Sequence, residues 1–254
     1  MCGFFTLDGV LIWQLPRFYH PFALTAHTEI ALPDALAHHA IRVLRLKDGQ
    51  DIVLFDGLGT QFPATLRIEG KKGFANLGAA ETPVRELAGR ITVLQGIASS
   101  DKMDWIIEKA VEMGVSCLVP IRAQRSVLQL SAERQAKRMV HWQRVIESAS
   151  EQCGRNRLME LAAPLSLSDY FRDARTGLHL FCDPDAPQQL AQAIKPQDQA
   201  VTILIGPEGG WSPEEQKVAL AAQAQAIRFG HRVLRTETAA LALTAAISAL
   251  QGWE

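Results

Sequence analysis

Cysteine is scarce in this chain and its spacing is irregular. The 254 residues include four cysteines, at positions 2, 117, 153 and 182, and no two of them form a C-x-x-C pair. Zinc sites usually present cysteines in such pairs, and disulfide frameworks belong mainly to small cysteine-rich domains. We therefore expect free thiols, with neither a zinc site nor a disulfide framework. The seven histidines also lack a metal-like spacing, so we expect no bound metal.

Long apolar runs are also lacking. No run reaches the roughly 18 residues that a membrane span needs. The start of the chain, MCGFFTLDGVLIWQL, is apolar, but Asp8 and Gly9 interrupt it and no Lys or Arg precedes it. A signal peptide would begin with a charged region. We expect residues 1–14 to be an N-terminal extension, either a leading strand or an irregular segment, and we expect a cytoplasmic chain without membrane attachment.

Neither sign of charge is in excess. The chain has 26 Lys and Arg residues against 27 Asp and Glu residues, a net charge of −1, which argues against a uniformly basic nucleic-acid binder. The average hides a local excess, because residues 122–157 contain eight Lys and Arg residues and only three Glu residues. Such a stretch can bind phosphate groups or can form a solvated helix face, and charge alone favours neither interpretation.

Residues 15–85 have the pattern of a small β domain. Short apolar runs such as DIVLFDG and FPATLRIEG alternate with glycine and proline, as strands of an antiparallel sheet or small barrel do when tight turns join them. One helix is predicted within residues 32–49, where Gly49 ends the run. Its apolar residues recur at three- and four-residue spacing: Leu36, Ala40, Val43 and Leu44.

From about Gly89 onward, predicted strands alternate with predicted helices. The strands are RITVLQGI, VSCLVP, GLHLFCD, VTILIGP and AIRFG, and the helices lie at about 100–113, 132–152, 213–224 and 237–250. For the first of these helices, Ser100 or Asp101 is the expected N-cap and Gly114 the expected stop. This alternation predicts a parallel sheet with helices on both faces.

In such sheets, ligands bind beyond the carboxyl ends of the strands. We therefore expect three loops to meet there: those after Phe181, Ile205 and Phe229.

The middle loop, GPEGG at 206–210, is glycine-rich but is not a phosphate loop. It lacks both the G-x-G-x-x-G pattern and the G-K-[ST] ending, it has no Lys or Arg close by in the sequence, and it carries Glu208. Glycines let the backbone approach a ligand closely, and a carboxylate accepts hydroxyl groups or attracts a cation. A ligand with ribose hydroxyls and a positive centre fits this loop better than a polyphosphate. An ordinary strand–helix turn explains Ser212 as N-cap and Pro213 as first helical residue, but it does not explain GPEGG.

A second unusual segment is FGHRVLRTETAALALTAAI, at 229–247. Arg232 and Arg235 lie three residues apart, just before a helix that Thr236 or Glu237 opens. The alanine-rich helix is compatible with simple close packing. Charged groups, however, are rarely buried unpaired, so two arginines and a glutamate at this junction indicate a site.

These two segments, in this order, resemble the SPOUT class of S-adenosylmethionine-dependent RNA methyltransferases. More narrowly, the chain resembles the RsmE family of 16S ribosomal RNA uridine-N3 methyltransferases. The other matching segments are LPRFYH (15–20), HHAIRVLRLKDGQDIVLFDGLG (38–59), KMDWIIEKAVEMGV (102–115), QRSVLQ (124–129) and WQRVIESASEQCGRNR (142–157). The resemblance implies a PUA-like RNA-binding β-barrel at 15–85, then a SPOUT domain at 86–254 with a C-terminal trefoil knot. It also implies a homodimer whose active site is completed across the interface.

The resemblance also implies roles for individual residues. S-adenosylmethionine is expected to contact Phe181, Ile205, Gly206, Glu208, Gly210, Leu234 and Thr236, with Glu208 near a ribose hydroxyl. Arg235 or Arg232 is expected to stabilise the uracil anion. Glu237 is expected to orient that arginine or act as the base, or else it is a first-turn carboxylate that the helix dipole favours.

The expected partner is 16S ribosomal RNA or the small ribosomal subunit. The expected RNA contacts are Arg17, His20, Arg42, Arg45, Arg125, Gln152, Arg155 and Arg157. Phe18 or Tyr19 could stack on an unpaired base, although a core position is the more common fate of such aromatics. Two alternatives stay open: a ribose 2′-O methyltransferase of the same superfamily, and a non-catalytic RNA-binding factor in ribosome assembly.

Overall fold

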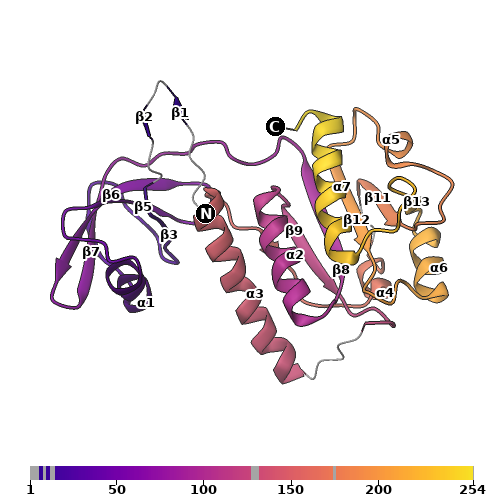
Figure 1. Ribbon diagram of the computed structural model, residues 1–254, viewed down its shortest axis with the longest axis horizontal. Helices are drawn as coiled ribbons and strands as arrows, with labels where there is room; N and C mark the ends of the chain where they lie inside the picture. The colour runs from indigo at the N-terminus through magenta and orange to yellow at the C-terminus, as the bar shows by residue number, and fades with distance from the viewer. Residues whose placement is uncertain (1–5, 8–9, 12–14, 127–131, 174–175, 254) are drawn as a thin grey trace. The chain divides into compact units, whose positions relative to one another are not determined.

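The computed structural model describes residues 6–7, 10–11, 15–126, 132–173 and 176–253. They fall into two compact units, Met1–Arg85 with Gly154–Arg157, and Glu86–Cys153 with Leu158–Glu254 (Figure 1). Within the predicted N-terminal extension, Thr6–Leu7 (β1) pairs antiparallel with Val10–Leu11 (β2). These residues form a separate two-stranded sheet, and the rest of the predicted extension lies outside the described residues.

The first unit is built on a five-stranded sheet of order β3-β5-β6-β7-β4. Its strands are β3 (Arg17–Tyr19), β4 (Glu29–Ala31), β5 (Asp51–Phe55), β6 (Gln61–Glu69) and β7 (Lys72–Leu77). All neighbours pair antiparallel except β3 and β5, which are parallel. Apolar residues of β3, β5, β6 and β7, including Phe18 and Leu54, form one core.

The predicted helix of this unit is real, but its buried face differs from the expected one. An α-helix, α1 (Asp34–His38), continues into a π-helix, η1 (His39–Val43), in which Leu44 N donates to His39 O at 2.9 Å. A π turn contains one more residue than an α turn, so the residues after it rotate away from the α-helical stripe. Ala40 is buried as predicted, whereas Val43 and Leu44 are 56% and 46% exposed.

The segment Gly154–Arg157 joins the first unit through a polar network. The Arg17 guanidinium donates to Gln61 Oε1 at 2.8 Å and also to Asn156 Oδ1. Gln61 Nε2 in turn donates to Glu81 Oε2 at 2.7 Å, and the backbone of Asn156 accepts from Gly59 N at 3.1 Å. Four residues that follow a helix of the second unit therefore belong structurally to the first.

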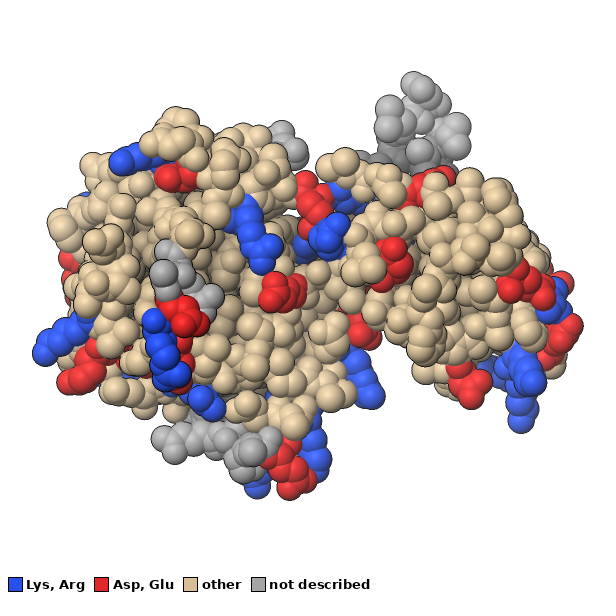
Figure 2. Space-filling model, turned by 180° about the vertical axis from the view of Figure 1, so that it is seen from behind, with Lys and Arg blue, Asp and Glu red and all other residues tan. Residues whose placement is uncertain are grey.

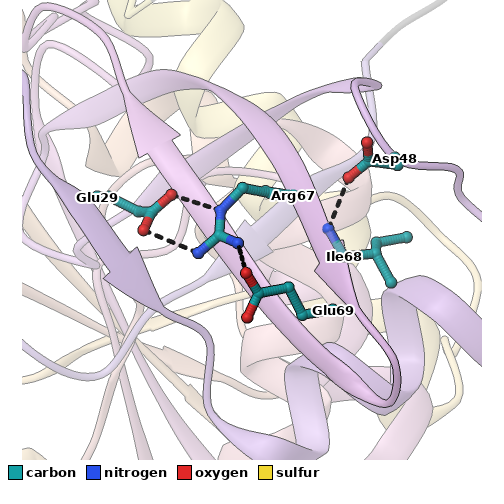
Figure 3. A network of polar contacts seen from close by, with 5 residues as sticks. All are labelled: Glu29, Asp48, Arg67, Ile68 and Glu69. Carbon is teal, nitrogen blue, oxygen red and sulfur yellow. Dashed lines mark hydrogen bonds and ion pairs between the residues drawn. The ribbon is translucent and has the colours of Figure 1, made fainter.

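A second network lies on the surface of this sheet (Figure 3). Arg67 on β6 donates to both carboxylate oxygens of Glu29 on β4, at 2.6 and 2.9 Å, and also to Glu69. Its guanidinium lies 4.2 Å from the centroid of the Phe74 ring. The contact with Glu29 reaches from β6 across β7 to β4, and the guanidinium has protein partners on several sides.

The second unit contains a six-stranded sheet in which all pairs are parallel, as predicted. Its order is β10-β9-β8-β12-β11-β13. The strands are β8 (Arg90–Gly96), β9 (Cys117–Ile121), β10 (Glu160–Leu161), β11 (Leu178–Cys182), β12 (Ala200–Ile205) and β13 (Gln225–Ile227).

Helices cover both faces of this sheet, as the strand–helix alternation predicts. They are α2 (Ser100–Glu112), α3 (Ala132–Cys153), α4 (Leu167–Tyr170), α5 (Leu190–Ala193), α6 (Pro213–Ala221) and α7 (Thr236–Gln251). Val93 and Ile203 pack with α2, α3 and α7, whereas their neighbours Leu94 and Leu204 pack with α4 and α6. On the first face α2 lies between α3 and α7 (Figure 1).

The helix limits follow the predictions closely. Ser99 is the N-cap residue of α2, one position before the expected Ser100 or Asp101, and Gly114 ends the helix with φ +80°. None of the helices in the described residues is long and apolar enough to cross a membrane.

The cysteines that the structure describes carry free thiols, as predicted. Cys117, Cys153 and Cys182 are free, and Cys2 lies outside the described residues. No group of three or more potential metal ligands occurs within the described part of the chain. On the face seen in Figure 2, basic and acidic side chains are interspersed.

Candidate active site

A pocket of about 670 Å³ lies in the second unit, where the loops after β11, β12 and β13 come together. This is the carboxyl edge of the parallel sheet, where the alternation of strands and helices predicts a ligand. All seven residues expected to contact a cofactor line it: Phe181, Ile205, Gly206, Glu208, Gly210, Leu234 and Thr236. Arg232 and Arg235 line it as well, and Glu237 follows in the first turn of α7.

Two glycines explain the shape of the loop after β12. A Cβ atom on Gly96, at the end of β8, would come within 2.5 Å of Pro207, so only glycine permits this approach. Gly210 has φ +70°, a conformation that glycine adopts readily, and its missing side chain faces open space.

The loop then enters α6 through the predicted cap. Ser212 Oγ accepts from Glu215 N at 3.1 Å, Glu215 Oε2 accepts from Ser212 N at 2.9 Å, and Pro213 is the first helical residue. Glu215 Oε1 also accepts from Gln124 N at 3.0 Å. The capping box therefore also connects the loop after β9 to this side of the pocket.

A buried hydroxyl joins the loop after β12 to the start of α7. Thr236 Oγ1 donates to Gly206 O at 2.7 Å and accepts from Gln95 Nε2 at 2.8 Å. Gln95 is fully buried at the end of β8 and also donates to Gly96 O at 3.0 Å. Thr236 therefore lines the pocket while its hydroxyl connects the chain segments that shape it.

Lys102, in the first turn of α2, lies between two carboxylates of the site. Its Nζ atom is 3.3 Å from Glu208 Oε1 and 3.7 Å from Glu237 Oε2. Glu208 Oε1 also accepts from Ser99 N at 3.0 Å. Burial raises the pKa of Glu208, but hydrogen bonds from the Ser99 and Glu208 backbone and from Lys102 outweigh it, so the pKa lies below the ordinary value. Glu208 is therefore ionised and already has protein partners.

The fold brings basic residues to the pocket from segments distant in the sequence from the GPEGG loop. The loop has no Lys or Arg near it in the sequence, but the fold brings five basic residues to the pocket: Lys102, Arg125, Arg228, Arg232 and Arg235. Among the described residues, the side chains of Arg232 and Arg235 have no hydrogen bond or ion pair, whereas Arg228 donates to Ala186 O at 3.3 Å. Glu237, which was expected to orient an arginine, to act as the base or to be a first-turn carboxylate, lies 3.7 Å from the ammonium of Lys102.

The apolar part of the pocket contains Phe181 and Trp211, whose ring centroids are 5.9 Å apart. Trp211 Nε1 is buried and has no hydrogen-bond partner within the described residues. Burial raises the pKa of the Cys182 thiol to about 12, so this pocket residue stays protonated at neutral pH. The pocket thus combines aromatic surface and backbone polar groups with both basic and acidic residues, the latter being Asp183, Asp185 and Glu208.

Comparison with known proteins assigns the family. Residues 85–248 match the model of an RNA methyltransferase domain, and residues 32–75 match that of an RNA methyltransferase PUA domain. The structure of ribosomal RNA small subunit methyltransferase E (RsmE) from Neisseria gonorrhoeae, bound to S-adenosylmethionine, is 34% identical with a TM-score of 0.87. The match covers 93% of this chain and 98% of that one. This chain belongs to the RsmE family.

Other RsmE relatives and structural neighbours agree. A Legionella pneumophila protein solved with bound S-adenosylmethionine is 31% identical, with a TM-score of 0.89 over 93% of this chain and 98% of that chain. RsmE of Bacillus subtilis is 27% identical over 220 residues, which cover 83% of this chain and 86% of the relative.

The residues that the RsmE resemblance implies for RNA contact are divided between the two units. Arg42, Arg45 and Arg157 are exposed in the first unit, and Gln152 is exposed on α3 in the second. Arg125 lines the pocket, where its guanidinium lies 3.5 Å from Gly209 O.

Three of these residues are in positions that do not suit RNA contact. His20 and Arg155 are each 4% exposed, and His20 Nδ1 lies 3.0 Å from Phe22 O. Arg17 is engaged with Gln61 and Asn156. Phe18 lies in the core, so only Tyr19 of the two aromatics keeps partial exposure. His20, Phe18 and Arg155 are therefore buried within the first unit, and Arg17 is hydrogen-bonded inside it.

Sequence reasoning did not single out Lys102, Gln95 or Trp211. Lys102 and Gln95 had one available signal: they flank the carboxyl end of β8, the edge of the sheet where ligands bind. The position of Trp211 directly after GPEGG was a similar signal.

Proposed function

We propose that this chain transfers the methyl group of S-adenosylmethionine to N3 of a specific uridine in 16S ribosomal RNA. The observation that carries the proposal is the pocket at the carboxyl edge of the sheet, where the GPEGG loop and the segment Arg232–Glu237 meet. Membership of the RsmE family and the S-adenosylmethionine-bound relatives support the choice of cofactor and substrate.

The pocket fits a phosphate-free nucleoside cofactor. Its volume of about 670 Å³ lies within the range usual for small-molecule sites. The backbone at Ile205, Gly206 and Gly210 offers close-range polar groups, and Phe181 with Trp211 offers apolar surface, which together suit an adenine and a ribose. The carboxylate of Glu208 has Lys102 and Ser99 as partners, and a ribose hydroxyl would donate to an oxygen that these partners already hold in place.

Methylation at N3 requires removal of a weakly acidic imide proton and stabilisation of the resulting negative charge. When bound, S-adenosylmethionine supplies an electrophilic methyl group on a sulfonium. Arg235, with Arg232 beside it, is our candidate to stabilise the uracil anion, because its guanidinium lines the pocket without a partner among the described residues. Glu237 is our candidate to receive the proton, because one of its carboxylate oxygens is buried beside the pocket and lacks a hydrogen bond there.

The finer architecture is part of the same proposal. Residues 15–85 are proposed to close into a PUA-like barrel, and residues 86–254 to form a SPOUT domain with a trefoil knot around the pocket. We further propose a cytoplasmic homodimer with an active site completed by the partner subunit. The match to an RNA methyltransferase PUA domain supports the barrel, and the meeting of three C-terminal loops supports the knot. The homodimer rests on the RsmE resemblance alone.

We propose that exposed basic and polar residues contact the RNA. Arg42, Arg45, Arg157 and Gln152 keep the exposure that such contacts need, and Arg125 would act at the pocket itself. Phosphate contacts of this kind position the RNA without reading its sequence.

The test is methyl transfer from labelled S-adenosylmethionine to small ribosomal subunits, and to naked 16S RNA, from a strain that lacks the modification. Mass spectrometry of the digested RNA should locate the label on N3 of uridine. A label on the ribose would replace this proposal with a 2′-O methyltransferase. Cofactor and RNA binding without transfer to either substrate would favour a non-catalytic assembly factor.

A further inference from the structure

The ion pairs of Lys102 connect three separate segments of the chain. Lys102 lies in the first turn of α2, Glu208 lies in the loop after β12, and Glu237 lies in the first turn of α7. One ammonium group therefore faces two carboxylates, one on the cofactor side of the site and one next to the candidate catalytic arginine.

The two carboxylates depend on Lys102 to different degrees. Glu208 Oε1 keeps a second partner, the Ser99 backbone N–H at 3.0 Å. Glu237 Oε2 is buried, has no hydrogen bond within the described residues, and has Lys102 as its ion-pair partner at 3.7 Å. The Glu237 side chain is 20% exposed. A partly buried carboxylate that loses its counter-charge is held less firmly, because the desolvation of its buried oxygen is no longer offset.

From this asymmetry we infer that Lys102 is a positioning residue for methyl transfer, acting through Glu237. Lys102 holds the Glu237 carboxylate beside the uracil ring that is to be methylated. It thereby does the work that an arginine of the 232–235 segment would otherwise do, and leaves the Arg235 guanidinium available for the substrate. The inference rests on the proposed methyltransferase function and adds to it a residue from a distant segment.

Removing the ammonium should therefore affect chemistry more than cofactor binding. In Lys102→Gln, Glu208 keeps its bond from Ser99, so the cofactor Kd should change less than about threefold, whereas displacement of a group at the reacting centre should lower the transfer rate about 10- to 100-fold. Lys102→Arg should recover most of the rate, because it restores a cation within reach of both carboxylates.

A double-mutant cycle tests the path through Glu237. We would measure single-turnover methyl transfer at saturating cofactor, and cofactor Kd by calorimetry, for Lys102→Gln, Glu237→Gln and the double variant. If Lys102 acts through Glu237, then Lys102→Gln should lower the rate less than about twofold in the Glu237→Gln background.

Lys109→Gln is the matched control. Lys109 lies on the same helix and also bridges two glutamates, Glu108 and Glu112 at 2.7 Å each, but it does not line the pocket. It should transfer methyl groups at the wild-type rate. Thermal unfolding of every variant would identify any that fails to fold, and Lys102→Arg then serves as the test of the inference.

The experiments distinguish a failure of the role inferred for Lys102 from a failure of the proposed methyltransferase function. Additive losses in the cycle, equal losses in Kd and rate, or the same loss in Lys109→Gln would each overturn the role of Lys102 while leaving the methyltransferase function intact. A wild-type chain that binds the cofactor but transfers no methyl group to small-subunit RNA would overturn the proposed function, and the inference with it.

Discussion

In the first unit the Arg17 guanidinium donates to Gln61 and Asn156, whereas Arg232 and Arg235 at the pocket have no side-chain partner among the residues that the structure describes. An arginine has five N–H donors and is usually hydrogen-bonded when buried. Where the protein supplies the acceptors, the arginine stabilises the fold. Arg232 and Arg235 are exposed, so their donors are open to a ligand, and we propose that the same residue type has different roles in the two units.

Arg67 extends this comparison to the surface. It has Glu29, Glu69 and Phe74 as partners, so its donors and one ring-facing side are used within the sheet (Figure 3). The local sequence pattern does not distinguish Arg67 or Arg17 from Arg235, because all three are arginines at the ends of or within apolar segments; the RsmE resemblance sets Arg235 apart.

The largest expected effect follows from Arg235. Arg235→Ala should lower the methyl-transfer rate about 100- to 1000-fold, the loss typical when a group that stabilises a developing negative charge is removed. Cofactor Kd and the unfolding midpoint should change little, because the guanidinium has no protein partner in the described chain to lose. Single-turnover kinetics, calorimetry and thermal unfolding would measure the three quantities.

Arg172→Ala is the control for this variant. Arg172 is an exposed arginine of the same unit that is already bonded to Asp169, so its removal should leave the rate unchanged. Equal losses of binding and turnover in Arg235→Ala would instead place Arg235 in the cofactor pocket.

A smaller effect is expected from the hydroxyl that joins the two pocket loops. Thr236→Val removes both the donor to Gly206 O and the acceptor for Gln95. Leaving such buried groups unpaired typically destabilises a protein by about 1–3 kcal/mol, and the displaced loop should weaken cofactor binding about tenfold. Denaturant unfolding and calorimetry would measure both changes. Thr236→Ser keeps the hydroxyl and should have the stability and cofactor affinity of the wild type. A valine variant with wild-type affinity would show that the loops hold their shape without this hydrogen bond.

Arg17 should affect stability and leave the pocket unchanged. Arg17→Met removes the bonds to Gln61 and Asn156 and should destabilise the first unit by about 1–2 kcal/mol. Hydrogen exchange of β3 and β6 would report the loss, and the cofactor Kd should stay at the wild-type value because the pocket lies in the second unit. If the variant kept full stability but lost RNA affinity, Arg17 would return to the set of RNA contacts.

The smallest effect, and the one most dependent on pH, is expected at Arg67. The hydrogen bond from Arg67 holds the pKa of Glu29 below its ordinary value of 4.5. Because the pKa of Glu29 is lower in the folded state than in the unfolded chain, the pair stabilises the fold fully at pH values above the unfolded-state pKa. This stabilisation is lost as the pH falls through the folded-state pKa. Thermal unfolding of Arg67→Gln and wild type should therefore differ slightly at neutral pH, and the difference should disappear as the pH falls well below 4.5. An unchanged difference at both pH values would mean that the contact with Phe74, and not the ion pair, is the source.

Much of the second unit could be predicted because its signals are local. The apolar runs of β8, β11 and β12, the cap at Ser212 and the stop at Gly114 each depend on a few neighbouring residues. The carboxyl-edge rule then places GPEGG and Arg232–Glu237 at the same edge of the sheet, and the structure brings them into one pocket.

The sequence predictions differ from the structure where contacts between distant segments decide which side chains are buried or paired. The π turn at His39–Val43 rotates Val43 and Leu44 outward, and no residue pattern in that segment predicts this turn. His20 and Arg155 look like RNA contacts because of their residue types, but both are buried within the fold. Lys102 is separated from Glu208 by more than a hundred residues, so its pairing could not be seen in the sequence of the loop.

The sequence by itself determined the order of the elements, the parallel sheet and the glycine-rich loop, since apolar periodicity, caps and turns are properties of neighbouring residues. The RsmE resemblance, carried by ordered motifs, likewise needed no coordinates. Only the tertiary structure decided the charge of the pocket. Lys102, Arg125 and Arg228 reach it from other segments, so the loop that lacks a basic residue along the chain is surrounded by basic residues in space. Electrostatic interactions depend on the distance between atoms and not on separation in sequence. The fold places the ammonium of Lys102 at 3.3 Å from Glu208, although the loop of Glu208 contains no cation.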